Sequence, residues 1–255
     1  MHDWFDSPPG RYLLAWEQAR LDEAVVDVFG YQSLQLGMPM LEGLRTNRMP
    51  HRWLAVGNDP APAADAPWPW TPHLHAHAVA LPFADNSLDL VVLPHTLELS
   101  HDPHAALREV ARVLVPEGRV VLCGLNPASL WGLRRQRARL YQQLGSDAVQ
   151  VPGAGEWIGP WRLRDWLRLL NFEVDDTVFG CFRPAVRTEK WLQRWRGIET
   201  VGARCWPILG AAYFMVAIKR VHGTRLLEPA WRSGRQHVAG SVPVANRISK
   251  DRTSE

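Results

Sequence analysis

Six of the ten histidines in this chain lie between residues 73 and 104, and imidazole binds metals and transfers protons near neutral pH. His73, His75 and His77 occupy alternate positions, which face the same side of a β-strand. Together with His101 or His104 they would offer the nitrogen ligands that zinc or nickel accepts. Because no cysteine or acid completes the pattern, we keep a metal-binding module as an alternative hypothesis and assign no metal site.

Hydrophobic periodicity predicts the elements that must position these side chains. Strands alternate with helices, which is typical of a parallel sheet joined by right-handed crossovers. The predicted strands are 31–37, 53–56, 73–79, 88–93, 119–123, 172–178 and 213–219. The predicted helices are 10–29, 41–47, 103–114, 130–144 and 161–170.

Composition indicates a globular chain in a reducing compartment, and we expect a cytoplasmic location. The three cysteines are widely spaced and form no CxxC pair, so we expect them to be free and buried. The N-terminal segment has acids and prolines where a signal peptide needs basic and then apolar residues. The longest mostly apolar run, 206–218, is too short to form a transmembrane segment.

Charge is distributed unevenly along the chain. Residues 1–127 contain 8 basic and 15 acidic side chains, whereas residues 128–255 contain 21 and 11. A basic half can meet an anionic partner such as a phosphorylated metabolite, a membrane surface or nucleic acid, or it can simply form a solvated face. No nucleic-acid motif accompanies the charge, so binding of nucleic acid is possible but unsupported. The tryptophans of this half would supply either an aromatic acceptor surface or core packing.

The segment from Leu81 to Asn126, LPFADNSLDLVVLPHTLELSHDPHAALREVARVLVPEGRVVLCGLN, carries a family pattern. It resembles the type 11 group of class I S-adenosylmethionine-dependent methyltransferases in the order and spacing of its motifs, although Leu99 stands where relatives often have histidine. The resemblance implies an α/β, Rossmann-like sheet of seven strands, mostly parallel with an antiparallel last strand and helices on both faces. It also implies S-adenosyl-L-methionine as the cofactor.

The glycine-rich loop after the first strand departs from the family pattern. Relatives have an acid followed by G-x-G-x-G, whereas this chain has Gln35, Gly37, Met38, Pro39 and Leu41 in the aligned segment. Only the first glycine is kept, and proline lacks an N–H and fixes φ. By the resemblance, the Gln35 amide replaces an acid that attracts the cofactor's ammonium group.

Three further places would line the cofactor in the family. The resemblance places Asn58 or Asp59 at the ribose and His77-Ala78 at the adenine. Pro94-His95 would lie at the methionine end, although His95 could instead cap the following helix. The predicted cofactor-binding residues are therefore Gln35, Gly37, Met38, Asn58, His77, Ala78, Pro94 and His95.

Methyl transfer from a sulfonium requires mainly alignment, with a base only where the acceptor must lose a proton. The candidates for that base are His95, Glu98 and His101. We expect an N-terminal helical extension (1–30), a methyltransferase-like domain (31–221) and a disordered tail (222–255). The two leading hypotheses are an enzyme acting on an unidentified small-molecule or anionic acceptor, and a non-catalytic relative whose cofactor site has decayed and whose basic half binds an anionic partner.

Overall fold

The computed structural model describes residues 2–57, 73–143, 155–185 and 193–221. The described strands are β1 (Gln32–Leu36), β2 (His51–Val56), β3 (His73–His75), β4 (Leu88–Pro94), β5 (Leu114–Leu125), β6 (Phe172–Gly180) and β7 (Ala212–Lys219). The helices are α1 (His2–Phe5), α2 (Pro8–Val25), α3 (Thr96–Leu99), α4 (Pro103–Val113), α5 (Leu130–Gln143), α6 (Pro160–Leu169) and α8 (Arg196–Cys205), with a 3₁₀ turn η1 (Pro207–Leu209). Among these residues, no helix is both long and apolar enough to cross a bilayer.

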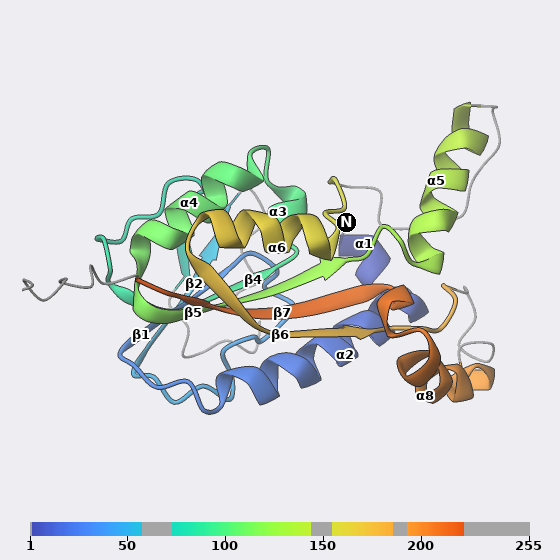
Figure 1. The fold of residues 1–255 in the computed structure, drawn as a ribbon, viewed down its shortest axis with the longest axis horizontal. Coiled ribbons are helices and arrows are strands. Elements are labelled where there is room, and N and C mark those ends of the chain that lie inside the picture. Colours follow the sequence, from blue (N-terminus) through green and yellow to red (C-terminus); the bar gives the residue numbers. More distant parts are fainter. Residues whose placement is uncertain (1, 58–72, 144–154, 186–192, 222–255) are drawn as a thin grey trace, which may run out of the picture. The chain divides into compact units, whose positions relative to one another are not determined.

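The seven strands form one sheet in the order β3-β2-β1-β4-β5-β7-β6. Strands β1 to β5 pair in parallel, and β7 runs antiparallel to both of its neighbours, β5 and β6. Helices α4 and α6 cover one face of the sheet and α2 covers the other (Figure 1). The predicted fold, a seven-stranded Rossmann-like sheet with an antiparallel last strand, is confirmed.

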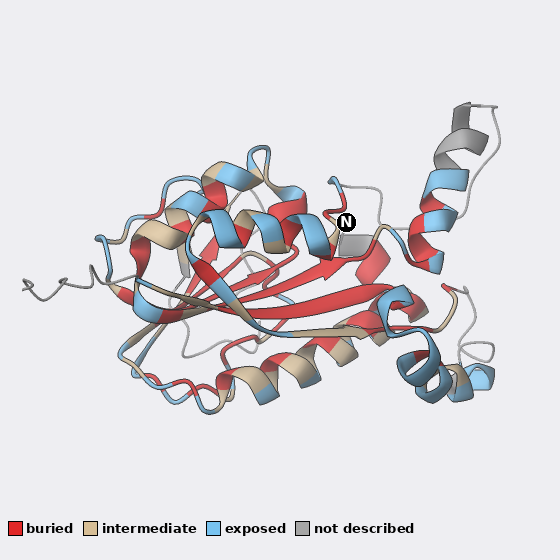
Figure 2. Ribbon diagram, viewed as in Figure 1, coloured by how far each residue is buried: buried red, intermediate tan, exposed pale blue. Residues whose placement is uncertain are grey.

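Two apolar clusters lie on the two faces of the sheet, and the strands β1, β4, β5 and β7 are buried along most of their length, whereas β6 is mostly half-buried or exposed (Figure 2). On α4, Ala106, Leu107, Val110 and Val113 are buried at helical spacing, and Asp102 caps the helix by accepting a hydrogen bond from the Ala105 N–H. Strand β4 is buried on both faces, as its continuous apolar run predicts.

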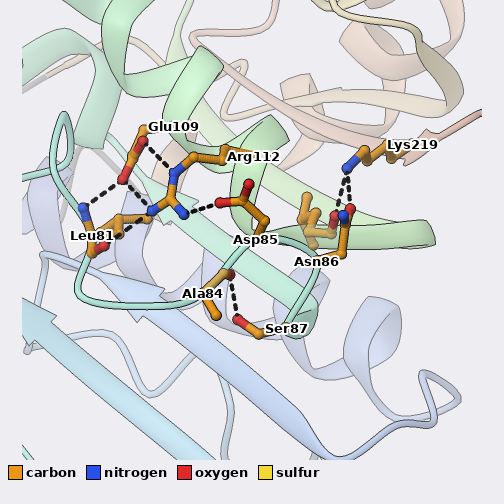
Figure 3. A network of polar contacts seen from close by, with 9 residues as sticks. Leu81, Ala84, Asp85, Asn86, Ser87, Glu109, Arg112 and Lys219 are labelled. Atoms are coloured by element: carbon orange, nitrogen blue, oxygen red, sulfur yellow. Dashed lines mark hydrogen bonds and ion pairs between the residues drawn. The ribbon is translucent and has the colours of Figure 1, made fainter.

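Hydrogen bonds and ion pairs join the connection between β3 and β4 to helix α4 (Figure 3). Arg112 forms ion pairs with Glu109 and Asp85 and donates to the Leu81 carbonyl, while Glu109 accepts from the Leu81 N–H at 2.8 Å. These ion pairs raise the pKa of Arg112 and lower that of Glu109. The network therefore ties the loop that contains Leu81 and Asp85 to helix α4.

The predicted helix 41–47 is wrong, because consecutive turns with i→i−3 bonds occupy this segment. The Gln35 side-chain amide forms hydrogen bonds with the Leu41 carbonyl and the Gly43 N–H. The Gln18 side-chain amide forms hydrogen bonds with the N–H and the carbonyl of Glu42. These side chains take the backbone groups that an α-helix would have to pair internally.

Other boundaries also differ from the prediction. The strand expected over 73–79 ends at His75, because a tight turn between His77 and Ala80 follows it. Strand β5 extends beyond 119–123 in both directions and contains Glu117 at a positive φ of 64°. The helices α3 and α8 were not predicted. Residues 222–255, predicted to be a disordered tail, lie outside the described residues.

Candidate functional site

A cavity of about 430 Å³ opens at the carboxyl ends of β1, β2, β3 and β4. Open α/β sheets bind their ligands at this edge, and the volume lies within the range of small-molecule sites. The lining residues are Leu36, Gly37 and Met38 after β1; Ala55 and Gly57 at β2; Ala76, His77, Ala78 and Val79 after β3; and Pro94, Thr96, Leu99, Ser100, His101 and Asp102 after β4.

Five of the eight residues predicted to bind the cofactor line this cavity. They are Gly37, Met38, His77, Ala78 and Pro94. Gln35 and His95 are buried and are not part of the lining. Asn58, and with it Asp59, lies outside the described residues.

The backbone at Gly37 and Met38 is left-handed, with φ of 75° and 48°. A Cβ atom added to Gly37 would meet only Thr96 Oγ1, at 3.8 Å. Space is therefore available at this position, and its requirement for glycine comes from the backbone conformation. Thr96 Oγ1 donates to the Leu36 carbonyl at 2.5 Å, which ties the exit of β4 to the exit of β1.

The Gln35 side chain organises the loop after β1 from inside. Its Nε2 lies 3.1, 3.0 and 2.8 Å from the carbonyl oxygens of Gly37, Met38 and Leu41, and its Oε1 accepts from the Gly43 N–H at 2.9 Å. A carboxylate cannot donate a hydrogen bond, so the acid of the family could not hold these three carbonyls. The amide of Gln35 is thus suited to this loop, because it can donate hydrogen bonds to the loop carbonyls and a carboxylate cannot.

His95 links the exit of β4 to helix α2. Its Nε2 donates to Glu17 Oε1 at 2.8 Å and its Nδ1 donates to Glu98 Oε2 at 3.0 Å, and all three side chains are buried. Glu98 Oε1 also accepts from the Leu125 N–H at 2.6 Å. His95 is the N-cap residue of α3 with φ of 53°, but its side chain makes no cap bond. The Glu17–His95–Glu98 network therefore fixes a left-handed turn between Pro94 and Thr96, two residues that line the cavity.

The two carboxylates determine the charge of this histidine. Burial by itself lowers the pKa of His95, but the charges and hydrogen bonds of Glu17 and Glu98 outweigh it and raise the pKa to about 10. An unfolded histidine titrates near 6.5. The imidazolium is therefore the form present at neutral pH, and it has no free nitrogen with which to accept a proton.

This pKa shift predicts a loss of stability at alkaline pH. The folded protein holds the His95 proton more tightly than the unfolded chain does, so the stabilisation is complete below pH 6.5 and is lost as the pH rises towards 10. Urea unfolding across this range should show a declining free energy of unfolding. A His95→Leu variant should lack this component of the decline, and an identical slope in both proteins would contradict the assignment.

Among the three candidate bases, only His101 lines the cavity. Sequence reasoning missed Thr96 and Glu17. Glu17 stands between Leu13 and Leu21 at intervals of four residues on the buried side of α2, and an acid within an apolar stripe is the signal that could have identified it.

The histidines of the metal hypothesis do not gather in the described part of the chain. His77 begins the turn after β3 and lines the cavity, whereas His104 packs against the Trp166 ring with centroids 3.8 Å apart. The side chain of His73 is outside the description. No group of three metal-ligating side chains occurs among the residues that the structure describes. Of the three free cysteines, Cys123 and Cys181 are buried as expected, whereas Cys205 is exposed.

Comparison with known proteins finds similarity to methyltransferases. The sequence model described as "Methyltransferase domain" matches residues 50–122. An uncharacterised protein of Escherichia coli, YafS, is 45% identical over 94 residues, which cover 37% of this chain and 36% of that protein. Demethylmenaquinone methyltransferase of Corynebacterium efficiens is 50% identical over 44 residues, 17% of this chain and 19% of the enzyme. The chain thus spans well under half the length of these relatives.

Solved structures agree on the fold. A methyltransferase of Thermotoga maritima, described as S-adenosylmethionine-dependent and a possible histamine N-methyltransferase, has a TM-score of 0.56 at 16% identity, over 82% of this chain and 92% of its own. A similar enzyme of Archaeoglobus fulgidus has a TM-score of 0.54 at 17% identity, over 81% and 94%. The fold that the resemblance implied is confirmed: the chain has the class I methyltransferase fold, and its residues 50–122 match the methyltransferase domain model.

Proposed function

We propose that this chain is an S-adenosylmethionine-dependent methyltransferase that holds its cofactor in the cavity at β1–β4. The observation that carries the proposal is the coincidence of that cavity with the family's cofactor positions at Gly37, His77-Ala78 and Pro94. S-adenosylmethionine is the cofactor of the family and of its structural neighbours. The residues present fit it, because the left-handed Gly37 leaves an open approach to the backbone.

The chain's own residues have modest tasks in this reaction. When bound, the cofactor supplies an already activated methyl group, so the protein mainly orients the acceptor and excludes water. The backbone of Gly37 and Met38 would hold the methionine end, and His77 and Ala78 would face the adenine. Of the three candidate bases, His101 is the one that lines the cavity, where it could take a proton from the acceptor. The acceptor itself is an unidentified small or anionic molecule, and a cytoplasmic location is part of the proposal.

Calorimetric titration with S-adenosylmethionine, and in parallel with S-adenosylhomocysteine, tests the proposal directly. Micromolar binding, about −8 kcal/mol, is expected. No binding up to millimolar concentration, about −4 kcal/mol, would favour the non-catalytic alternative. That alternative draws on the lost glycines of the loop and on the engagement of Gln35 with the backbone rather than with a ligand.

Gly37→Val is expected to weaken cofactor binding by more than about tenfold. Valine is strained at a φ of 75°, and its branches would enter the cavity between Leu36 and Thr96. The matched control is Gly197→Val, since a Cβ at Gly197 meets no atom within 4 Å. Equal affinities for the two variants would place the cofactor elsewhere.

A further inference from the structure

The segments that follow β5 and β6 form one surface at the carboxyl edge of the sheet. Trp131 Nε1 on α5 donates to the Arg183 carbonyl at 2.8 Å, and Arg134 donates to the Ala185 carbonyl at 2.6 Å. On the other side, α8 packs against Phe182, whose ring lies 2.6 Å from the position of a Cβ on Gly202. Helices α5 and α8 therefore both contact the same short stretch after β6, beyond the end of the sheet (Figure 1).

The turn η1 belongs to the same surface. Asn126, which follows β5, donates through Nδ2 to the carbonyls of Ile208 and Gly210 at 2.7 and 3.0 Å. Because β5 and β7 are antiparallel and Leu125 pairs with Ala212, η1 lies at the carboxyl end of β5. This edge is the one where the cavity opens between β1 and β4.

Large apolar side chains are exposed across this surface. Figure 2 shows α8 as mostly exposed, in contrast to the buried strands behind it. Seven large apolar side chains are between 41% and 62% exposed. They are Leu130, Leu133, Trp195, Val201, Trp206, Ile208 and Leu209. Single exposed apolar residues are ordinary, but a group of seven on connected elements marks an interaction surface.

The charge of the same elements is positive. Helix α5 contains four arginines, of which Arg135 is buried, and no acid. The segment 194–209 contains three arginines and one acid, Glu199, and that carboxylate is occupied by the Tyr12 hydroxyl and the Arg183 guanidinium. An anionic partner is therefore favoured.

We propose that this surface, formed by α5, α8 and η1, docks on an anionic lipid bilayer. Tryptophan with arginine suits either nucleic acid or a membrane interface. The aliphatic members Leu130, Leu133, Val201, Ile208 and Leu209 decide between them, because they offer nothing to bases or phosphates and gain by burial among acyl chains. As a consequence that rests on the proposed function, the acceptor would reach the cavity from the membrane surface.

Vesicle sedimentation of the full chain tests the docking. The protein should bind vesicles of phosphatidylcholine mixed with phosphatidylglycerol, bind phosphatidylcholine alone much more weakly, and lose affinity as salt rises. Arg204→Gln should reduce the partition coefficient about fivefold. Trp206→Ser combined with Ile208→Ser should reduce it at least about tenfold.

A matched pair of variants lies at the opposite edge of the sheet. Arg168 and Leu169 end α6 next to the amino end of β6, and Leu169 is 81% exposed. Arg168→Gln combined with Leu169→Ser removes one positive charge and one exposed apolar side chain, and it should leave vesicle binding unchanged. Equal losses of vesicle binding in the control variant and in the variants of the proposed surface would overturn the proposal. Absence of binding to anionic vesicles at low salt would also overturn it. So would tighter binding to a single-stranded oligonucleotide, if the same substitutions weaken that binding.

The cofactor titration separates this proposal from the proposed function. Every variant should bind S-adenosylmethionine in solution as the unaltered chain does, which also shows that it is folded. Vesicle binding without cofactor binding would support the docking surface and reject the methyltransferase function. Cofactor binding without vesicle binding would support the methyltransferase function and reject the docking surface.

Discussion

Replacing His95 with leucine should lower the free energy of unfolding by about 3–5 kcal/mol. The imidazolium is the counter-charge of Glu17 and Glu98, and all three side chains are buried. Its removal leaves two carboxylates without their partner in a low-dielectric interior, where an uncompensated charge is costly. Urea unfolding at pH 6.5, where the network is fully formed, is the measurement of choice.

Two further variants show whether charge or packing is responsible. His101→Leu removes an exposed histidine of the same connection and should change stability by no more than about 0.5 kcal/mol. Glu17→Leu added to His95→Leu removes one stranded carboxylate and should recover part of the loss. If the double variant is less stable than His95→Leu alone, the network acts through shape rather than charge.

The same substitution should also affect the cavity. The network holds the left-handed turn at His95, and the neighbours Pro94 and Thr96 line the cavity. Cofactor affinity is therefore expected to fall in His95→Leu even under conditions in which the variant is fully folded. Through Glu17, helix α2 would act as a positioning element for the cofactor site, although it contributes no residue to the lining of the cavity.

How far the sequence predicts this molecule depends on the range of the interactions involved. The β4 strand and α4 were predicted closely, because continuous apolar burial and an Asp-Pro helix start are local signals. His77-Ala78 was placed in the cavity for a similar reason: its offset from Leu81 follows the family pattern. Patterns of this kind depend on neighbouring residues, so a single sequence reveals them.

The interactions that the sequence did not predict join distant residues. Glu17 and His95 are 78 positions apart, so periodicity could identify neither partner from the other. The helix expected at 41–47 failed because Gln18 and Gln35 capture its backbone groups from outside the segment. Likewise, alignment with the family's acid suggested that Gln35 contacts the cofactor, whereas its amide forms hydrogen bonds with the loop.

Gln35→Glu offers the sharpest test of the altered loop, because it restores the acid of the family. By analogy with relatives the acid would strengthen cofactor binding, but the geometry predicts the reverse. The carboxylate would face the carbonyl oxygens of Gly37, Met38 and Leu41 with no hydrogen to donate. We expect stability to fall by about 1–3 kcal/mol and cofactor affinity to fall at least about tenfold at neutral pH.

Acidic pH should partly rescue this variant, since a protonated carboxyl group regains one donor for the three carbonyls. The control is Gln136→Glu, the same change at an exposed position on α5, which should bind the cofactor normally. The decisive variant adds Pro39→Gly to Gln35→Glu, so that the loop regains one of the family's glycines together with its acid while the buried Leu41 stays in the core. If the amide and the loop are matched, this double variant should bind S-adenosylmethionine better than Gln35→Glu alone. Undiminished binding by Gln35→Glu alone would instead show that the amide has no part in shaping the loop.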